Sequence, residues 1–325
     1  MKKQGKIRAF CVDFCSVICY NIEVCNYFDD GRKRGGKMPD TKGWGENFPK
    51  AVFDHLFHVY GARCGVVGGE DFRSCITNEK RAEGFSSCLI AVFPYFCGER
   101  DGRISLYARF RDYHEVLTEA LNDAAERFLP ESCRVWRACA DVSPINEVRA
   151  AALAGLGCIG KNGLLITPEY GSYVFIGEIL LPFEINSEKA EIGGCTECGR
   201  CVSACPTGAL EGKGECLSAL TQKKRLTPEE EAVIFKCGMQ WGCDVCQKVC
   251  PMNENVKKTA IPDFTGKTVS EITEFDTRDL SDDGIKEKYA GRAFLWRGAQ
   301  VLRRNEAISK GGSSSDVCKN QTDGR

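Results

Sequence analysis

Two stretches of the chain carry hydrophobic residues at helical spacing. In residues 48–60, Val52, Leu56 and Val59 recur at the intervals of one helix face, which predicts an amphipathic helix. Residues 111–128 repeat apolar side chains at the same period over a greater length. They predict a long helix with one face against the core.

Short apolar runs bounded by turn residues predict strands around these helices. Residues 64–67 end at two glycines, which suits a short buried strand. Residues 88–93 are continuously apolar and end at Pro94, which is typical of a central strand buried on both faces. Residues 134–136 predict one more strand, which would deliver the chain to Asp141.

The part of the chain that follows is rich in glycine at the ends of its predicted elements. Ser143 and Pro144 have the residue types of a helix N-cap and first turn, and they predict a helix that ends at Gly155. Strands are predicted next at residues 164–166 and 173–181. Such glycines allow a backbone to approach a large planar or phosphate-bearing ligand closely, although ordinary turns use the same residues.

The strongest chemical signal is a run of cysteines at fixed spacing. Two residues separate Cys195 from Cys198 and Cys198 from Cys201, three more lead to Cys205, and Pro206 comes next. This is the bacterial ligand run for iron–sulfur clusters, in which the fourth cysteine usually binds a different cluster from the first three.

A second, altered copy of the run lies farther along the chain. It has glutamine where its leading cysteine would fall, so Cys216 and Cys237 are the candidates for the missing ligand. Paired C-x2-C elements also build zinc sites, which is the alternative. Two endings in C-x3-C-P favour two iron–sulfur clusters over a zinc ribbon. The cysteines of this copy are Cys243, Cys246 and Cys250.

Length, charge and cysteine content limit the domain number, the binding partners and the compartment that fit this chemistry. The 325 residues suit one large or two modest domains, and a hydrophobic content of 43% suffices for a core. The net charge of −1 provides no general attraction for nucleic acid. Because the cluster motifs use about eight of the 21 cysteines, a reducing compartment is indicated rather than a disulfide framework. No apolar run approaches the ~20 residues of a membrane span, so we expect a cytoplasmic protein.

The first 47 residues are expected to form a divergent or disordered N-terminal extension without chemistry of its own. A basic start followed by an apolar stretch is similar to a signal peptide, but Asp13, Asn21 and Glu23 interrupt the apolar part. Three cysteines there lie at helical spacing, yet no partner motif supports a metal site.

Four segments of the chain, taken in order with both cysteine motifs, are similar to one known family. The segments are residues 103–114, 141–147, 155–162 and 171–180. Together they resemble epoxyqueuosine reductase, a cobalamin-dependent iron–sulfur enzyme of tRNA queuosine biosynthesis. The resemblance covers roughly residues 48–308.

The resemblance implies an α+β fold, in which an α/β cobalamin-binding domain precedes a ferredoxin-like double 4Fe–4S module. The catalytic domain would span residues 48–186 and the two-cluster domain residues 187–262. A helical remnant would follow at residues 263–308, and a disordered tail at residues 309–325.

The resemblance also implies roles for individual residues. Asp141 matches the acid that protonates the departing oxygen, and Lys161 and Ser172 fall in stretches that look like the corrinoid pocket. Without the resemblance, Asp141 would be interpreted as a carboxylate placed near a helix start. One cluster would be held by Cys195, Cys198, Cys201 and Cys250, and the other by Cys205, Cys216, Cys243 and Cys246.

The implied reaction reduces the epoxide of epoxyqueuosine in tRNA to an alkene, with the oxygen lost as water. Two clusters can relay electrons from a flavodoxin or ferredoxin-type donor to the cobalt of cobalamin. Because the chain has three histidines and no cobalamin-binding histidine motif, we expect a cobalt without a histidine ligand. Asp141 must carry a proton, and burial beside an apolar macrocycle favours that form.

Three departures from the family bear on the substrate. Cys158 replaces the family's tryptophan, and Cys237 is an additional cysteine. The C-terminal helical repeats that help full-length enzymes to grip tRNA are reduced to one predicted helix at residues 292–308. We therefore expect a monomer that binds tRNA weakly. The alternatives are a corrinoid iron–sulfur reductase of another small substrate and a plain two-cluster electron-transfer protein.

Overall fold

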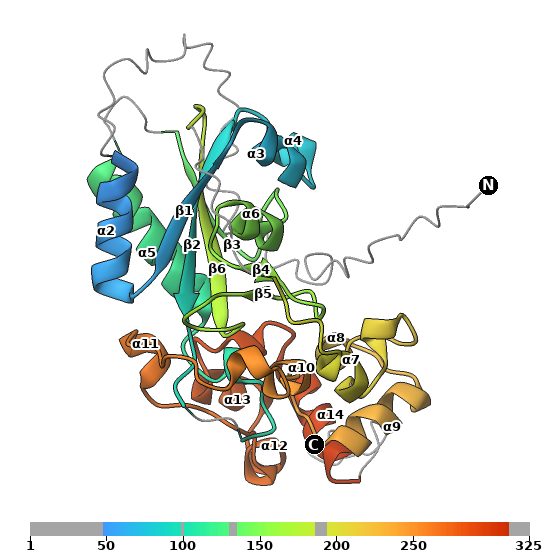
Figure 1. Ribbon diagram of the computed structural model, residues 1–325. Coiled ribbons are helices and arrows are strands. Elements are labelled where there is room, and N and C mark those ends of the chain that lie inside the picture. Colours follow the sequence, from blue (N-terminus) through green and yellow to red (C-terminus); the bar gives the residue numbers. More distant parts are fainter. Residues whose placement is uncertain (1–47, 99–100, 130–134, 186–193, 312–325) are drawn as a thin grey trace, which may run out of the picture.

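The computed structural model describes residues 48–98, 101–129, 135–185 and 194–311. The predicted N-terminal extension and most of the predicted tail lie outside these ranges. Figure 1 shows an upper part built around a sheet and a lower part built from short helices. The chain therefore combines helix and sheet in the segregated manner of an α+β fold, as predicted.

A four-stranded sheet in the order β1-β2-β6-β3 forms the centre of the upper part. Its strand pairs are all antiparallel, so the expectation of an α/β domain is wrong in this detail. Every residue of β2 is buried, which confirms the predicted central strand. The strand predicted at residues 134–136 begins instead at Arg137. The strands are β1 (Arg63–Gly68), β2 (Ser87–Pro94), β3 (Arg137–Ala140) and β6 (Val174–Leu181), with a separate pair, β4 (Cys158–Ile159) and β5 (Leu165–Ile166).

Helices cover both faces of this sheet (Figure 1). One face carries α2 (Phe48–Tyr60) and α5 (Tyr113–Phe128), and the other carries α3 (Gly69–Cys75) and α6 (Glu147–Leu153), with α4 (Glu79–Ala82) nearby. The two long predicted helices are confirmed. Helix α5 begins two residues later than predicted because the Asp112 side chain caps it by accepting from the His114 N–H. Val59 is 51% exposed, so it lies off the buried face of α2.

Helix α6 begins after the residues that were predicted to start it. Asn146 is its N-cap, with the side chain accepting from the Arg149 N–H. The carbonyl group of Pro144 instead accepts the N–H groups of Thr77 and Asn78. Because this segment pairs with a distant part of the chain, the helix starts at the next residue that can cap it.

The lower part consists of short helices and turns. The last helix starts at Ala299, seven residues later than predicted, because residues 293–295 form a separate 3-10 turn. The helices are α7 (Arg200–Ala204), α8 (Leu217–Gln222), α9 (Pro228–Cys237), α10 (Val245–Lys248), α11 (Pro262–Thr265), α12 (Glu274–Asp279), α13 (Asp282–Lys288) and α14 (Ala299–Ser309). The 3-10 turns are Leu106–Ala108, Ala209–Glu211, Pro251–Asn253 and Ala293–Leu295.

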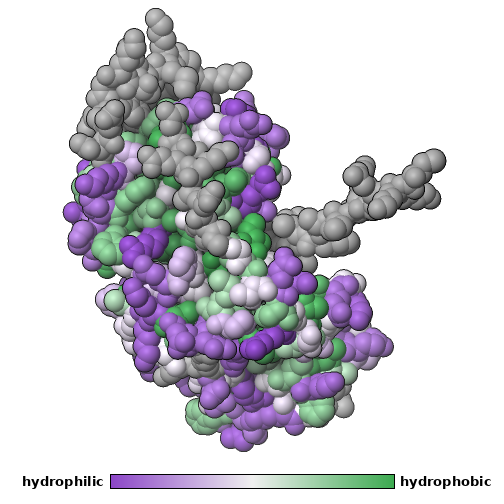
Figure 2. All heavy atoms as spheres, in the orientation of Figure 1, coloured by the Kyte–Doolittle hydropathy of each residue, from purple (hydrophilic) through white to green (hydrophobic). Residues whose placement is uncertain are grey.

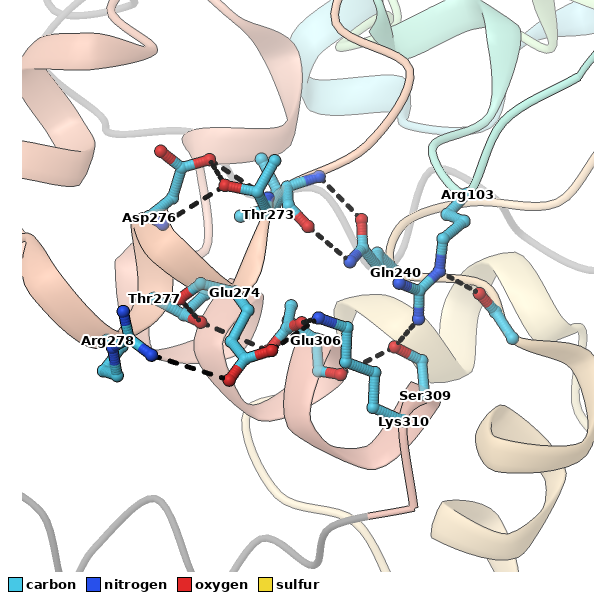
Figure 3. Close-up of polar contacts among 12 residues, drawn as sticks. Arg103, Gln240, Thr273, Glu274, Asp276, Thr277, Arg278, Glu306, Ser309 and Lys310 are labelled. Atoms are coloured by element: carbon cyan, nitrogen blue, oxygen red, sulfur yellow. Dashed lines mark hydrogen bonds and ion pairs between the residues drawn. The ribbon is translucent and has the colours of Figure 1, made fainter.

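The segment between β2 and α5 leaves the upper part and joins the lower core. Ile104 bridges to Trp241, and both are buried in one hydrophobic cluster. Figure 3 shows Arg103 and Gln240 in the adjoining polar network. The Arg103 Nε atom donates to the Gly238 carbonyl at 3.1 Å, and Gln240 exchanges two hydrogen bonds with the Ile272 backbone at 2.7 and 2.8 Å. This segment therefore holds the two parts together.

The visible surface shows hydrophilic side chains over both parts of the molecule, with smaller hydrophobic areas between them (Figure 2). In the described ranges, no helix combines the length and the apolar character that a membrane crossing requires.

Candidate functional site

The four cysteines assigned to the first cluster line one small cavity in the lower part. They are Cys195, Cys198, Cys201 and Cys250. Burial raises the pKa of the Cys201 thiol, and the nearby thiols of Cys195 and Cys250 raise it further. Cys250 of the second motif therefore lies together with the first three cysteines of the first motif.

The other four predicted ligands form a second group. Burial raises the pKa of Cys243 and of Cys246 to about 12, and Cys216 adds to both shifts. The Cys216 thiol has its own pKa raised by burial and by Cys205. Helix α7 divides the first motif, because Cys201 lies within it and Cys205 lies just past its end.

The two additional cysteines lie in different surroundings. Cys237 packs into the small hydrophobic cluster of Leu217, Ile234 and Ile308. Cys158 lies near the first cysteine group, where burial raises its pKa and Cys195 adds to the rise. Cys243 of the second group packs against the same hydrophobic cluster as Cys237, whereas Cys158 lies beside the first group.

Lys161 and its neighbour Asn162 also line the first cysteine cavity. The Asn162 side chain approaches the Cys246 thiol of the second group as well. Asn162 therefore lies between the two groups, a position that the sequence did not indicate. Lys161 is separated from the cavity that holds Asp141, so the two predicted pocket residues Lys161 and Ser172 do not meet.

Iron–sulfur clusters and zinc place different geometric demands on these thiols. Within the described ranges, no group of three His, Cys, Asp or Glu side chains is arranged to hold a single metal ion. Tetrahedral zinc needs four ligands within about 2.3 Å of one atom, whereas a cubane spreads its four thiolates over four irons.

Asp141 borders a second cavity, of about 130 Å³, where β3 ends and α6 begins. The backbone of Asp141 has a φ of 67°, in the left-handed region that few residues other than glycine adopt. The polar residues of the lining are Asp141, Glu147, Ser172 and Tyr113, and the apolar ones are Val148, Leu164, Leu165, Val174, Phe175 and Ile176. One carboxyl-bearing wall thus faces a largely apolar space.

His114 joins Asp141 to Asp112. Its Nδ1 atom lies 2.6 Å from Asp112 Oδ1, and its Nε2 atom lies 3.2 Å from Asp141 Oδ2. Burial lowers the pKa of His114, but the two carboxylates outweigh it and raise the pKa to about 9. The imidazole is therefore charged at neutral pH and held between two carboxyl groups.

Ser172 connects the Asp141 cavity to the cysteine domain. Asn253 accepts from the Ser172 N–H at 2.8 Å and donates to its hydroxyl oxygen at 2.9 Å, while Gln247 donates to its carbonyl oxygen at 2.8 Å. A Cβ atom on Gly171 would lie 1.9 Å from the Asn253 Oδ1 atom, so this approach requires glycine. Because Gln247 and Asn253 flank Cys250, the cavity wall is fixed to a cysteine-bearing segment.

Three residues of this arrangement had no predicted role: His114, Gln247 and Asn253. The signal for His114 was the triplet Asp112-Tyr113-His114, in which a helix cap precedes an imidazole. Gln247 and Asn253 lie next to a recognised motif, but only the fold shows that they reach Ser172.

Two family models match parts of the chain. One is described as a 4Fe-4S double cluster binding domain and matches residues 194–253. The other is described as Epoxyqueuosine reductase QueG, DUF1730, and matches residues 78–142.

Epoxyqueuosine reductases are also found among similar full-length proteins. That of Gloeobacter violaceus is 38% identical over 230 residues, which cover 67% of this chain and 72% of that protein. That of Prochlorococcus marinus is 32% identical over 247 residues, or 71% of this chain and 79% of that protein. That of Lactococcus garvieae is 35% identical, and the chain spans 63% of its length.

The fold agrees with these matches. The structure of epoxyqueuosine reductase from Streptococcus thermophilus superimposes with a TM-score of 0.70 and 26% identity, covering 81% of this chain and 80% of that one. The cysteine motifs, the matched segments and the superposition agree with one another, and the chain therefore belongs to the epoxyqueuosine reductase family.

Proposed function

We propose that this protein is an oxidoreductase that reduces the epoxide of epoxyqueuosine in tRNA to an alkene. One observation carries the proposal beyond family membership. Ser172 lines the cavity of Asp141 and is hydrogen-bonded to Gln247 and Asn253, which flank Cys250. A carboxylic acid therefore borders a cavity whose wall is hydrogen-bonded to the segment that would carry electrons.

The overall reaction needs two electrons and two protons. It breaks both carbon–oxygen bonds of the epoxide, forms the carbon–carbon double bond and releases the oxygen as water. We propose that two 4Fe–4S clusters carry the electrons. Cys195, Cys198, Cys201 and Cys250 would hold one, and Cys205, Cys216, Cys243 and Cys246 would hold the other.

Cobalamin is the proposed second cofactor, and it would supply a strong nucleophile for opening the epoxide. The apolar side of the Asp141 cavity, with Leu165, Val174 and Ile176, has the chemistry expected beside a flat macrocycle. Ser172 would be a polar contact in the same cavity, and Lys161 a contact at the first cysteine group.

Asp141 is proposed as the general acid that protonates the departing oxygen. His114, at 3.2 Å, would keep its carboxyl group oriented. Asp112 would hold the imidazole from the other side at 2.6 Å.

The proposed partners follow from this chemistry. A flavodoxin or ferredoxin-type protein would donate single electrons, and tRNA would carry the substrate. A net charge of −1 provides little attraction for phosphates, so we expect weak tRNA binding. We also propose that the protein is a monomer and that it works in the cytoplasm, where thiolates stay reduced.

The test is turnover of tRNA that contains epoxyqueuosine by anaerobically purified protein loaded with cobalamin and given a reductant. Digested tRNA is analysed by mass spectrometry for queuosine. We expect Asp141→Asn to lower turnover ~10²- to 10⁴-fold, because the amide keeps the shape but has no transferable proton. The matched control is Asp279→Asn, an exposed residue paired with Arg278, which should retain activity. No queuosine from the unmodified protein would refute the proposed substrate, and an active Asp141→Asn variant would refute the role of Asp141.

A further inference from the structure

Two buried glutamates lie at and behind the Asp141 cavity without a cationic partner. Glu178 lies in β6 and is fully buried, and its carboxyl oxygens make no hydrogen bond of ordinary geometry, although the Ser143 hydroxyl approaches them. Glu147 is the first residue of α6 and lines the cavity with Asp141. Its Oε2 atom is buried and also lacks a partner. The mechanism proposed above uses neither residue.

The position of Glu178 follows from the alternation of side chains along β6. Val174 and Ile176 line the cavity, and Glu178 is the next residue on that face of the strand. Its neighbours across the sheet are Ile90 and Cys139. The hydrophobic cluster between this face and α6 surrounds it, so its carboxyl group lies in apolar surroundings just behind the cavity.

Such surroundings favour the protonated forms of both acids. An ionised carboxylate there would have lost its hydration without gaining a partner. Burial raises the pKa of Glu178 to about 8, and Asp141 adds to the rise while the Ser143 hydroxyl opposes it. Burial also raises the pKa of Glu147 well above its usual range, and Glu178 and Asp141 add to that shift. The pair therefore retains protons at neutral pH.

The other ionisable groups near the pair do not reverse this preference. The arginines of the packed elements are engaged elsewhere: Arg137 of β3 donates to the Arg81 carbonyl and Arg149 of α6 to the Ser74 hydroxyl. The charged His114 is held between Asp112 and Asp141. The remaining groups facing the pair can only be neutral or negative, and they are Asp141, Tyr113, and the thiols of Cys88 and Cys139.

We propose that Glu147 and Glu178 form a buried proton reserve that returns a proton to Asp141 during turnover. The inference rests on the proposed function, in which one epoxide consumes two electrons from the external one-electron donor and two protons. Asp141 can carry one proton, so it must be reprotonated before the oxygen leaves as water. Glu147 borders the same cavity as Asp141, and Glu178 lies behind it and restores the proton of Glu147.

The first readout is infrared spectroscopy of the resting protein, which needs no turnover. A protonated carboxylic acid has a carbonyl absorption distinct from that of a carboxylate. We expect this absorption at pH 7, and we expect the part that Glu178 contributes to disappear as the pH rises past about 8. Glu178→Gln and Glu147→Gln should each remove part of it, because the amide resembles the protonated acid in shape. The control Glu229→Gln, on the exposed part of α9, should leave it unchanged.

The second readout is the pH profile of epoxide turnover. The unmodified protein should keep a nearly constant rate from pH 6 to about 8, because the reserve refills Asp141. In Glu147→Gln, protons must come from water, so the rate should fall about tenfold for each pH unit. If Glu147 had only a structural role, Glu147→Gln would lower the rate by the same factor at every pH.

Two results would overturn the inference: no carboxylic acid absorption at pH 7, or parallel pH profiles of the unmodified protein and Glu147→Gln. If Glu178→Gln failed to fold, Glu147→Gln would still give both readouts. An unmodified protein without any epoxide turnover would refute the proposed function instead. In that case the infrared absorption would still decide whether the pair holds protons.

Discussion

The contact between His114 and its two carboxyl groups allows a quantitative test. The pKa of His114 is raised from 6.5 to about 9, which corresponds to about 3 kcal/mol in favour of the charged imidazole. Asp112 lies closer, at 2.6 Å, than Asp141, at 3.2 Å. We therefore expect Asp112→Asn to lower the pKa of His114 by more than about one pH unit and Asp141→Asn to lower it by about one.

The assay is an NMR titration of the histidine side chains. The chain contains three histidines, and the His114→Gln variant identifies the resonance that belongs to this one. Asp112→Asn is a suitable change because asparagine is also a good N-cap, so the start of α5 is preserved. A titration of His114 near 6.5 in the unmodified protein would refute the reasoning, as would an unchanged pKa in Asp112→Asn.

The same contact determines how stability depends on pH. A histidine whose pKa is raised on folding contributes stability that is complete below its unfolded value and is lost as the pH rises through the folded value. The window therefore extends from 6.5 to about 9, and up to about 3 kcal/mol of the free energy of unfolding should be lost across it. Chemical denaturation of the Asp112→Asn variant should show a smaller loss across that window than the unmodified protein.

Two further predictions concern the clusters and the cavity wall. Iron analysis of anaerobically purified protein should find about eight irons and eight sulfides per chain. Cys216→Ala should lose about half of the iron, whereas Cys237→Ala, whose side chain packs in a hydrophobic cluster, should keep all of it. The reverse pattern would contradict the ligand assignment. By thermal denaturation, Gly171→Ala should be about 1–3 kcal/mol less stable than its control Gly163→Ala. Both variants place alanine at a positive φ, but only the alanine at position 171 would also clash with Asn253. Equal stabilities of the two variants would mean that the Asn253 contact contributes nothing.

The strands and long helices could be predicted because their signals are local. The run from Cys88 to Phe93 is apolar at every position, and it forms part of the fully buried β2. The start of α6 could not be predicted in the same way. Ser143 and Pro144 have the right residue types, but Thr77 and Asn78 occupy the Pro144 carbonyl group, and this pairing depends on the folded chain.

The cysteine motifs could be predicted for the same reason, since only two or three residues separate most of the ligands in the sequence. The second group needed more, because the family resemblance rather than the spacing pointed to Cys216 instead of Cys237 as its isolated member. Cys216 lies at the start of α8 with its pKa raised by burial and by Cys205, whereas Cys237 faces Leu217 and Ile234. Spacing alone left these two cysteines equivalent.

The backbone of Asp141 explains why its position depends on tertiary structure and why asparagine is the informative replacement. Its φ of 67° lies in a region that costs most residues about 1–2 kcal/mol, so local preference does not select it. The contact with His114, which Asp112 holds from its other side, helps to keep the Asp141 backbone in this conformation. Aspartate and asparagine tolerate the left-handed region better than other residues with a side chain. Asp141→Asn therefore preserves both the backbone and a polar contact with His114, and a loss of turnover in that variant reports on the missing proton rather than on a displaced loop.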